Sequence, residues 1–518
     1  MTKIDRAGLD RALDGLAQRY RGPGGVAGVV KDGTVIARRA WGYADLAEWR
    51  PMRAETRLPI CSISKQFTCG ILLDRVGDPA RLDGRVAEYL PKFSGAIPTV
   101  RQLCDNQSGL RDYWALTVLQ GAEPAQEFRR ADALPLIARM KSGHFPPGTA
   151  YSYCNCNFRI VSELIEAETG RSLAELYAER IFAPAGMATA VLTSDTRYPE
   201  DGVVGYEGND ATGFFAAANG IFWIGDAGIS ASLDDMLAWE AHIDATRDDA
   251  EGLYRRLSSP PVYGDGTPAT YGYGLSHETV AGRAVTGHGG ALRGFRAQRF
   301  HMPSERLSVV VMFNHEASAH EAAEVLLRAA LGHAPQKGRK PEGWAGQWLD
   351  PESGLLLRVS EDAEGLELRF ATSPDRLLPG EDGVARGPGV ALRRDGGGLV
   401  MDRTADNLLV RAEPLAPVEQ ADSRDLAGRY WSEELEAALE IESRDGGAYV
   451  GFDGMLGRGP MERMHPAGKD VWVVATRRSM DAPAPGDWTV QVRRDAAGAV
   501  AGLTLGCWLA RGITYARV

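Results

Sequence analysis

The sequence lacks the features that would place a protein at a membrane or on nucleic acid. It contains no run of about 18 apolar residues, so we expect no transmembrane helix. Its 58 basic residues are outnumbered by 69 acidic ones, and the net charge of −11 argues against binding to nucleic acid or to an anionic membrane surface. Residues 1–11 also lack the apolar stretch of a signal peptide. We therefore expect a cytoplasmic protein.

Cysteine and metal-binding patterns are also scarce. The chain has six cysteines in 518 residues, and without an export signal we expect free buried thiols, not disulfides. Cys154 and Cys156 form a C-x-C pair without a second pair at metal-binding spacing. His315 and His320 are one residue too far apart for the H-E-x-x-H helix of a zinc peptidase. We expect neither a metal nor a cofactor, and the missing G-x-S-x-G motif disfavours an α/β-hydrolase.

A serine and a lysine at helical spacing are the first positive signal. Apolar residues at Phe67, Ile71 and Leu72 predict a helix from Ile63 to about Asp74, which places Ser62 and Lys65 on one face of its first turn. A lysine that loses its proton when desolvated can activate such a serine as a nucleophile. The S-x-x-K pattern is common, however, and taken alone it more often marks a helix start with a solvated lysine.

The order of the predicted elements indicates an α+β catalytic region. Residues 26–31 and 34–37 flank an Asp-Gly turn and predict a β-hairpin. Residues 82–192 have a mostly helical pattern, interrupted by Pro- and Gly-rich breaks. A strand-like run at 309–314 precedes a helical segment at 319–331. Strands on both sides of a helical insert predict a sheet packed against a helical subdomain.

The chain changes character after a polar stretch at residues 332–344, which we interpret as a linker. Short alternating apolar runs separated by Asp-Gly and Gly-Gly turns follow and predict all-β structure. Residues 345–357 resemble residues 427–441, which indicates two similar β-domains. The predicted organisation is therefore multi-domain α+β, with a catalytic domain followed by two antiparallel β-barrels, and its boundaries are 1–332, 343–412 and 422–518.

Two further motifs could carry chemistry beside Ser62. Tyr153 and Asn155 follow a Pro-Pro-Gly turn, so a phenol able to relay a proton and an amide able to orient a substrate could enter one cleft. His288, Gly289 and Gly290 predict a strand that another backbone can approach closely. Taken singly, the Y-x-N pattern is no better than chance, because a core tyrosine near a turn also produces it, and a histidine flanked by glycines is more often part of a tight turn.

Taken together, S-x-x-K, Y-x-N and a Gly-rich strand with a basic residue resemble the signature of penicillin-recognising serine hydrolases. The resemblance implies a β-lactamase-like fold in which Ser62 is the nucleophile and Lys65 its proton acceptor. It implies Tyr153 as proton shuttle, Asn155 as a substrate-orienting group and His288 as the residue that completes the site. The third motif reads His-Gly-Gly here, not the commoner Lys-Thr-Gly, so the group bound by its basic residue is left open.

The whole chain resembles the bacterial D-aminopeptidases of this family, in which a loop of the last domain reaches the catalytic cleft. The stretch 106–114 (Asn-Gln-Ser-Gly-Leu-Arg-Asp-Tyr-Trp) fits this resemblance. The matching loop is 477–487, and Arg477, Asp481 and Asp487 are its candidate specificity residues. An aminopeptidase must bind an N-terminal ammonium, and a carboxylate in a shielded cleft does so well. Asp481 is therefore the candidate anchor, although an acidic hairpin loop is more often simply solvated.

The expected function is a serine aminopeptidase that removes N-terminal D-residues from peptides, amides and esters through an acyl-enzyme. The preference for D-alanine, glycine and D-serine is implied by the resemblance, as are a homodimer and β-lactams as candidate inhibitors. The expected partner is a small peptide or amino-acid amide. An esterase or D,D-peptidase on the same fold is the first alternative, and a non-enzymatic binding protein is the second.

Overall fold

The computed structural model describes residues 4–333, 341–370, 374–476 and 487–518. Its N-terminal region is built on an antiparallel sheet with the strand order β3-β2-β1-β13-β12-β11-β10-β9. These strands are β1 (Gly24–Lys31), β2 (Thr34–Asp45), β3 (Arg50–Pro51), β9 (Tyr271–Gly272), β10 (Leu275–Val280), β11 (Arg283–Leu292), β12 (Phe295–Met302) and β13 (Leu307–Phe313).

The predicted hairpin forms the start of this sheet. Strands β1 and β2 are joined through Asp32 and Gly33, whose φ angles of 51° and 73° are the left-handed values that this tight turn requires. Strand β1 then pairs with β13, so the beginning and the end of the catalytic region meet in the middle of the sheet. The helical insert between these strands is consequently held at one side of the sheet.

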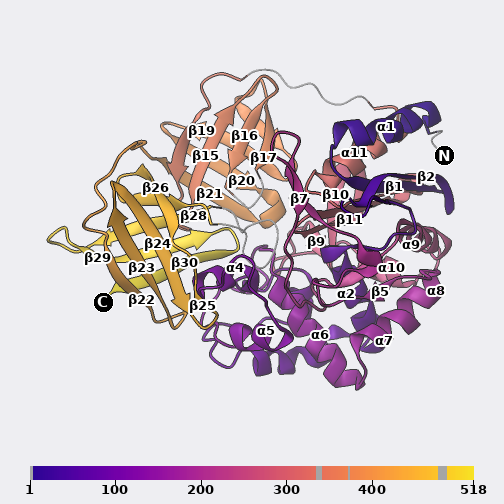
Figure 1. Cartoon of the computed structure of the whole chain (residues 1–518), viewed down its shortest axis with the longest axis horizontal. Coiled ribbons are helices and arrows are strands. Elements are labelled where there is room, and N and C mark those ends of the chain that lie inside the picture. Colours follow the sequence, from indigo (N-terminus) through magenta and orange to yellow (C-terminus); the bar gives the residue numbers. More distant parts are fainter. Residues whose placement is uncertain (1–3, 334–340, 371–373, 477–486) are drawn as a thin grey trace.

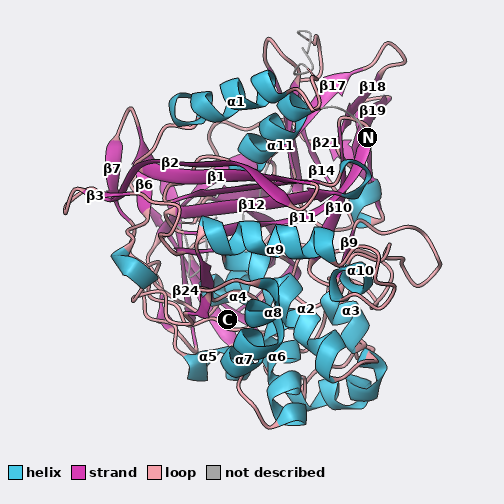
Figure 2. Ribbon diagram, turned by 90° about the vertical axis from the view of Figure 1, so that its right-hand side faces the viewer, coloured by secondary structure: helices cyan, strands magenta, loops and turns pink. Residues whose placement is uncertain are grey.

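Helices cover both faces of the sheet (Figure 2). Helices α1 (Arg6–Arg19) and α11 (Ala319–Ala330) pack together on one face, where the apolar stripe of α1 is fully buried. Helix α9 (Leu233–Ala245) packs against β1 on the other face. Helix α2 (Ser64–Arg75) lies on that side as well, and nearly all of its residues are buried. It is therefore a central helix, which fits its place between the sheet and the helical subdomain.

The helical subdomain surrounds α2. Its helices are α3 (Val100–Cys104), α4 (Tyr113–Leu119), α5 (Arg130–Ile137), α6 (Asn155–Thr169), α7 (Leu173–Tyr177), α8 (Ala183–Ala185) and α10 (Leu253–Leu257).

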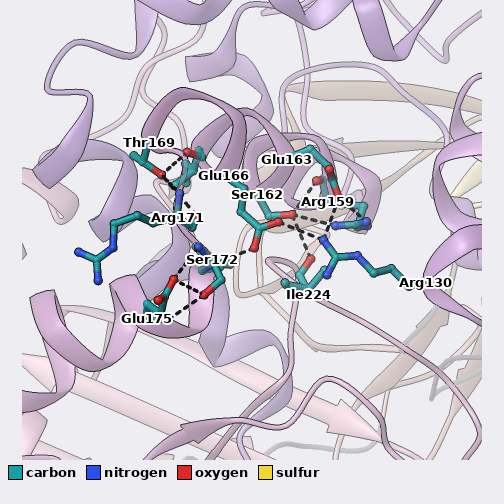
Figure 3. Close-up of polar contacts among 12 residues, drawn as sticks. Arg130, Arg159, Ser162, Glu163, Glu166, Thr169, Arg171, Ser172, Glu175 and Ile224 are labelled. Carbon is teal, nitrogen blue, oxygen red and sulfur yellow. Dashed lines mark hydrogen bonds and ion pairs between the residues drawn. The ribbon is translucent and has the colours of Figure 1, made fainter.

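Polar contacts fix the position of α6 along its length (Figure 3). Arg159 pairs with Glu163 one turn later, and the Ser162 hydroxyl lies 3.4 Å from the carbonyl of Ile224. Arg130 from α5 reaches Glu166 at 3.0 Å. The contact to Ile224 ties α6 to the loop before Asp226, and both α6 and that loop contribute atoms to the site described below.

Two β-domains follow the catalytic region and lie beside it (Figure 1). The first is a closed antiparallel barrel of β14 (Gly346–Leu349), β15 (Leu356–Glu361), β16 (Leu366–Arg369), β17 (Asp375–Pro379), β18 (Val384–Gly387), β19 (Val390–Asp395), β20 (Gly398–Arg403) and β21 (Leu408–Pro414). The second contains β22 (Gly428–Ser432), β23 (Ala437–Arg444), β24 (Gly447–Gly454), β25 (Gly457–Arg458), β26 (Glu462–Gly468), β27 (Val471–Val474), β28 (Trp488–Arg494), β29 (Val500–Cys507) and β30 (Ala510–Arg517), and the pairing of β23 with β24 closes it.

These observations confirm the predicted fold class. The two stretches that resemble each other in the sequence supply the first strands of the two barrels, β14 and β22. All six cysteines are buried, and the described residues contain no disulfide. Within the described ranges, no helix has the length and apolar character needed to cross a membrane. Most of the predicted linker, residues 334–340, lies outside the described residues.

Candidate active site

Ser62 lies in a 3₁₀ turn that leads directly into α2. The turn spans Cys61–Ile63, and Cys61 has a φ of 51°, which is unusual for a residue with a side chain. Helix α2 begins at Ser64, and Lys65 in its first turn lies next to Ser62, as the sequence spacing predicted. The turn points the serine hydroxyl into a cleft, while Lys65 is completely buried beneath it.

The amino group of Lys65 lies within hydrogen-bonding distance of polar atoms from separate parts of the catalytic region. It lies 2.9 Å from Ser62 Oγ, 2.8 Å from Asn155 Oδ1 and 2.7 Å from the backbone oxygen of Asp226. The amide and backbone oxygens can only accept, so each takes one amine hydrogen. The Ser62 hydroxyl can either donate or accept. A neutral Lys65 amine has two hydrogens for these oxygens and a lone pair for the Ser62 proton, so in this state the proton can pass to Lys65 without disturbing its hydrogen bonds to Asn155 and Asp226.

The orientation of the Asn155 amide is set by Asp112. Asn155 begins α6, and both its backbone N–H and its Nδ2 donate to Asp112 Oδ2, at 2.5 and 2.8 Å. Because a carboxylate only accepts, the amide must turn its oxygen towards Lys65. Complete burial raises the pKa of Asp112 to about 6, and the hydrogen bonds from Asn155 oppose this rise.

His288 on β11 faces the same cleft with both ring nitrogens engaged. Its Nδ1 lies 2.5 Å from the carbonyl oxygen of Gly289, so Nδ1 carries the hydrogen. Its Nε2 then accepts from the Tyr271 hydroxyl at 2.8 Å. Burial, with a smaller contribution from the charge of Lys65, lowers the pKa of His288 to about 3. The third motif therefore presents a neutral imidazole near pH 7.

The glycines beside His288 allow β11 to pack against the nucleophile turn. A Cβ atom at Gly290 would lie 2.3 Å from the carbonyl oxygen of Ile60, a contact that backbone atoms cannot relieve cheaply. At Gly289 a Cβ would instead lie 3.0 Å from the side-chain oxygen of Gln298, which can move. The sequence predicted a strand that another backbone can approach, and the nucleophile turn is such a backbone.

Aromatic rings enclose the lysine. Its amino group lies 4.9 Å from the ring centroid of Tyr153 and 5.3 Å from that of Phe158. The Tyr153 ring also contacts the rings of Tyr271 and His288, with centroids 6.3 and 6.0 Å away. These rings exclude water around Lys65 and still leave Tyr153 at the surface of the cleft.

The cleft has a volume of about 710 Å³ and lies where the three domains meet. Of the predicted catalytic residues, Ser62, Tyr153, Asn155 and His288 line the cleft. Both glycines of the third motif, Gly289 and Gly290, line it as well. The first barrel contributes Asp375, Arg403 and Asp406, and the last barrel contributes Trp508 and Leu509. The structure thus brings together residues that are more than 200 positions apart in the sequence.

The predicted specificity loop is described only at its end. Arg477 and Asp481 lie outside the described residues. Asp487 is partly exposed and lies 3.5 Å from Arg358 on the first barrel. No group of histidine, cysteine or carboxylate side chains suited to a metal ion occurs in the described part of the chain.

Sequence reasoning missed several residues of the site. Asp112 lies in a stretch that carried the family resemblance, but only its position before a helix could have singled it out. Asp226 contributes a backbone oxygen, which no side-chain motif reveals. Tyr271 and Trp508 come from a short strand and from a turn of the last barrel, and only the folded chain brings them to the cleft.

Comparison with known proteins matches both parts of this architecture. A family model described as beta-lactamase covers residues 9–334, and a model described as D-aminopeptidase, domain B, covers residues 337–516. A D-aminopeptidase of Cereibacter sphaeroides is 75% identical over 99% of this chain and 100% of its own length. The chain belongs to the D-aminopeptidase family.

Relatives of lower sequence identity also match the whole chain. A D-aminopeptidase of Brucella melitensis is 51% identical over the full length of both chains. The fold is shared with an octameric penicillin-binding protein homologue from Pyrococcus abyssi, with a TM-score of 0.55 and 18% identity, over 88% of this chain and 99% of that one. Family membership makes the protein an enzyme of the β-lactamase-fold serine hydrolases and sets aside the non-enzymatic alternative.

Proposed function

We propose that the enzyme is a serine aminopeptidase that releases N-terminal D-residues from peptides, amides and esters, with Ser62 as its nucleophile. The observation that carries the proposal is the environment of the Lys65 amino group. Its neighbours include two oxygens that can only accept hydrogen bonds and also the hydroxyl of Ser62. This arrangement is that of a buried base held against a nucleophile.

In the acylation step, Ser62 Oγ attacks the carbonyl carbon of the first residue while its proton passes to Lys65. Backbone N–H groups of Ser62 and of β11 after His288 would stabilise the negative charge on the carbonyl oxygen. When the C–N or C–O bond breaks, the leaving amine or alcohol takes the proton from Lys65, with Tyr153 as the relay at the cleft surface. The products are the free leaving group and an ester between Ser62 and the D-residue.

Deacylation repeats these steps with water as the nucleophile. Lys65 takes a proton as water attacks the ester, and Ser62 recovers that proton when its bond to the acyl carbon breaks. The residues present can supply every proton transfer.

The neutral state of His288 supports the aminopeptidase over the D,D-peptidase alternative. A D,D-peptidase must accommodate a substrate whose leaving group carries a carboxylate, which a cation binds well. Because the pKa of His288 is lowered to about 3, this residue provides no such cation near neutral pH. The third motif therefore suits leaving groups without a terminal carboxylate, as in amides, esters and longer peptides.

Substrate selection at the amino group is assigned to Asp481, with Arg477 and Asp487 as the charged flanks of the same loop. This assignment rests on the family resemblance and on the need to bind an ammonium group in a shielded cleft. On the resemblance we also propose that the preferred N-terminal residues are small, namely D-alanine, D-serine and the achiral residue glycine. The homodimer is a proposal on the same ground, and the cytoplasmic location is a proposal from the sequence pattern alone.

A comparison of blocked and unblocked substrates separates this function from its main alternative. We expect D-alanine p-nitroanilide to be hydrolysed at least about 100-fold more efficiently than its N-acetyl derivative, because the latter has no ammonium group to bind. Faster hydrolysis of the N-acetyl compound would favour the esterase or D,D-peptidase.

A further inference from the structure

Asp112 is completely buried, and the two oxygens of its carboxylate make two different kinds of contact. Oδ1 accepts the backbone N–H of Trp114 at 2.8 Å and so caps the N-terminus of α4. Oδ2 accepts both N–H groups of Asn155. The first contact is an ordinary helix cap, whereas the second reaches the residue that holds Lys65.

The last barrel binds the backbone of this same residue. The N–H of Asp112 donates to the carbonyl oxygen of Leu509 at 2.9 Å. Leu509 lies at the turn between β29 and β30, and this turn lines the cleft. Helix α4, which starts just after Asp112, lies next to the last barrel (Figure 1).

Neighbouring contacts hold the turn in place. The guanidinium of Arg111 donates to the carbonyl oxygen of Arg511 at 3.2 and 3.0 Å, and the N–H of Arg511 donates to His144 Nε2 at 3.1 Å. Arg511 in turn stacks on the ring of Trp508, 3.8 Å from its centroid. The turn 508–511 is thus anchored on both sides of the Leu509 carbonyl.

We propose that Asp112 is a positioning residue for catalysis and that the turn 508–511 of the last barrel fixes it in place. The order of contacts is Leu509 O to Asp112, Asp112 to Asn155, Asn155 to Lys65, and Lys65 to Ser62. The last barrel consequently contributes to the chemical step through a segment separate from the loop 477–487. This inference rests on the proposed roles of Ser62 and Lys65.

The decisive variant is Asp112→Ser. Serine is also a good helix N-cap, so it preserves the contact to Trp114 while it removes the carboxylate oxygen that binds Asn155. We expect kcat for D-alanine p-nitroanilide to fall about 50-fold with little change in KM, because the charge-assisted hydrogen bonds to Asn155 are lost. The pH profile adds a second readout. In the wild type kcat/KM should decline as the pH falls through about 6, where Asp112 takes up a proton, and this decline should be absent in the variant.

The matched control is Asp235→Asn. Asp235 is also a buried carboxylate, and it accepts from the backbone N–H groups of Ser232 and Thr189, away from the cleft. We expect its substitution to lower thermal stability and to leave the pH profile of kcat/KM unchanged. Full activity in Asp112→Ser would show that Asp112 is only a helix cap and would overturn the proposal.

The role of the turn is tested by a double variant, Trp508→Gly with Leu509→Gly, alone and together with Asp112→Ser. If the turn acts through Asp112, the combined loss in kcat should be close to that of Asp112→Ser alone. Losses that multiply would contradict the link between the turn and Asp112. Ser62→Ala is measured in parallel. If Ser62→Ala keeps activity, the proposed function fails. If Ser62→Ala is inactive while the Asp112 variants resemble the wild type, the present inference alone fails.

Discussion

The side-chain oxygen of Asn155 lies 2.8 Å from the amino group of Lys65, and the opposite end of the same amide is held by a buried carboxylate. If the Asn155 amide flipped, its N–H groups would face the Lys65 amine and its oxygen would face the Asp112 carboxylate, so neither end could form its hydrogen bond. We expect Asn155→Ala to reduce kcat about 100-fold, because Lys65 then loses one of the acceptors that direct it towards Ser62. Pre-steady-state release of p-nitroaniline measures the acylation rate directly. An unchanged burst rate would show that Asn155 has no part in acylation.

Lys65 provides the test of the catalytic base. Arginine retains a positive charge at all accessible pH values, so it cannot take the serine proton. We expect Lys65→Arg to lower kcat/KM by roughly 10³-fold, within the usual range for loss of a general base. Circular dichroism and the thermal unfolding midpoint check that the variant is folded. Substantial activity in a folded Lys65→Arg enzyme would move the role of base to another residue, with Tyr153 as the first candidate.

The two glycines after His288 offer a matched pair of substitutions. Gly290→Ala places a methyl group 2.3 Å from the backbone oxygen of Ile60, so either β11 or the nucleophile turn must shift. Gly289→Ala meets only the movable side chain of Gln298 at 3.0 Å. We expect Gly290→Ala to lower kcat at least about 30-fold, since sub-ångström displacement of a nucleophile is costly, and Gly289→Ala to lower it much less. Equal losses would show that the close approach of β11 is not critical.

Much of the catalytic region could be predicted from sequence because its signals are local. The Asp-Gly turn and the spacing of Ser62 and Lys65 each depend on a few neighbouring residues. The sequence also revealed the two barrels, because their alternating strands and repeated first segments are local patterns. The contacts that hold Lys65 could not be found in this way. One comes from a backbone oxygen at Asp226, which belongs to no motif. The other comes from Asn155, whose motif was predicted, but the orientation of its amide depends on Asp112, which no motif identified.

The charge state of His288 is a second property that could not be predicted from the sequence. Its place after a glycine on a strand was predicted, but its charge state depends on burial and on Tyr271, which are properties of the folded chain. A histidine could have replaced a lysine as a cation. Burial lowers its pKa to about 3, and both ring nitrogens have hydrogen-bond partners, which favours a neutral imidazole.

Buried histidines should make the fold sensitive to acid. Burial lowers the pKa of His301 to about 4, below the ordinary value of 6.5. Between these values the unfolded chain binds a proton that the folded chain does not, so the free energy of unfolding falls as the pH decreases from 6.5 to 4. In this range the free energy of unfolding of His301→Gln should depend less steeply on pH than that of the wild type, by about 1.4 kcal/mol per pH unit. Urea unfolding of both proteins at pH 4.5, 5.5 and 7.5 measures the difference, and parallel curves would show that His301 does not titrate as described.

The central claim is that Ser62, activated by Lys65, opens the bond after an N-terminal D-residue. Its most direct test is the rate of p-nitroaniline release from the D- and L-alanine p-nitroanilides by the wild type and by Ser62→Ala. We expect the wild type to hydrolyse the D-enantiomer at least about 100-fold faster than the L-enantiomer. We expect Ser62→Ala to be more than about 10³-fold less active than the wild type. Equal turnover of the two enantiomers, or activity that survives in Ser62→Ala, would contradict the account.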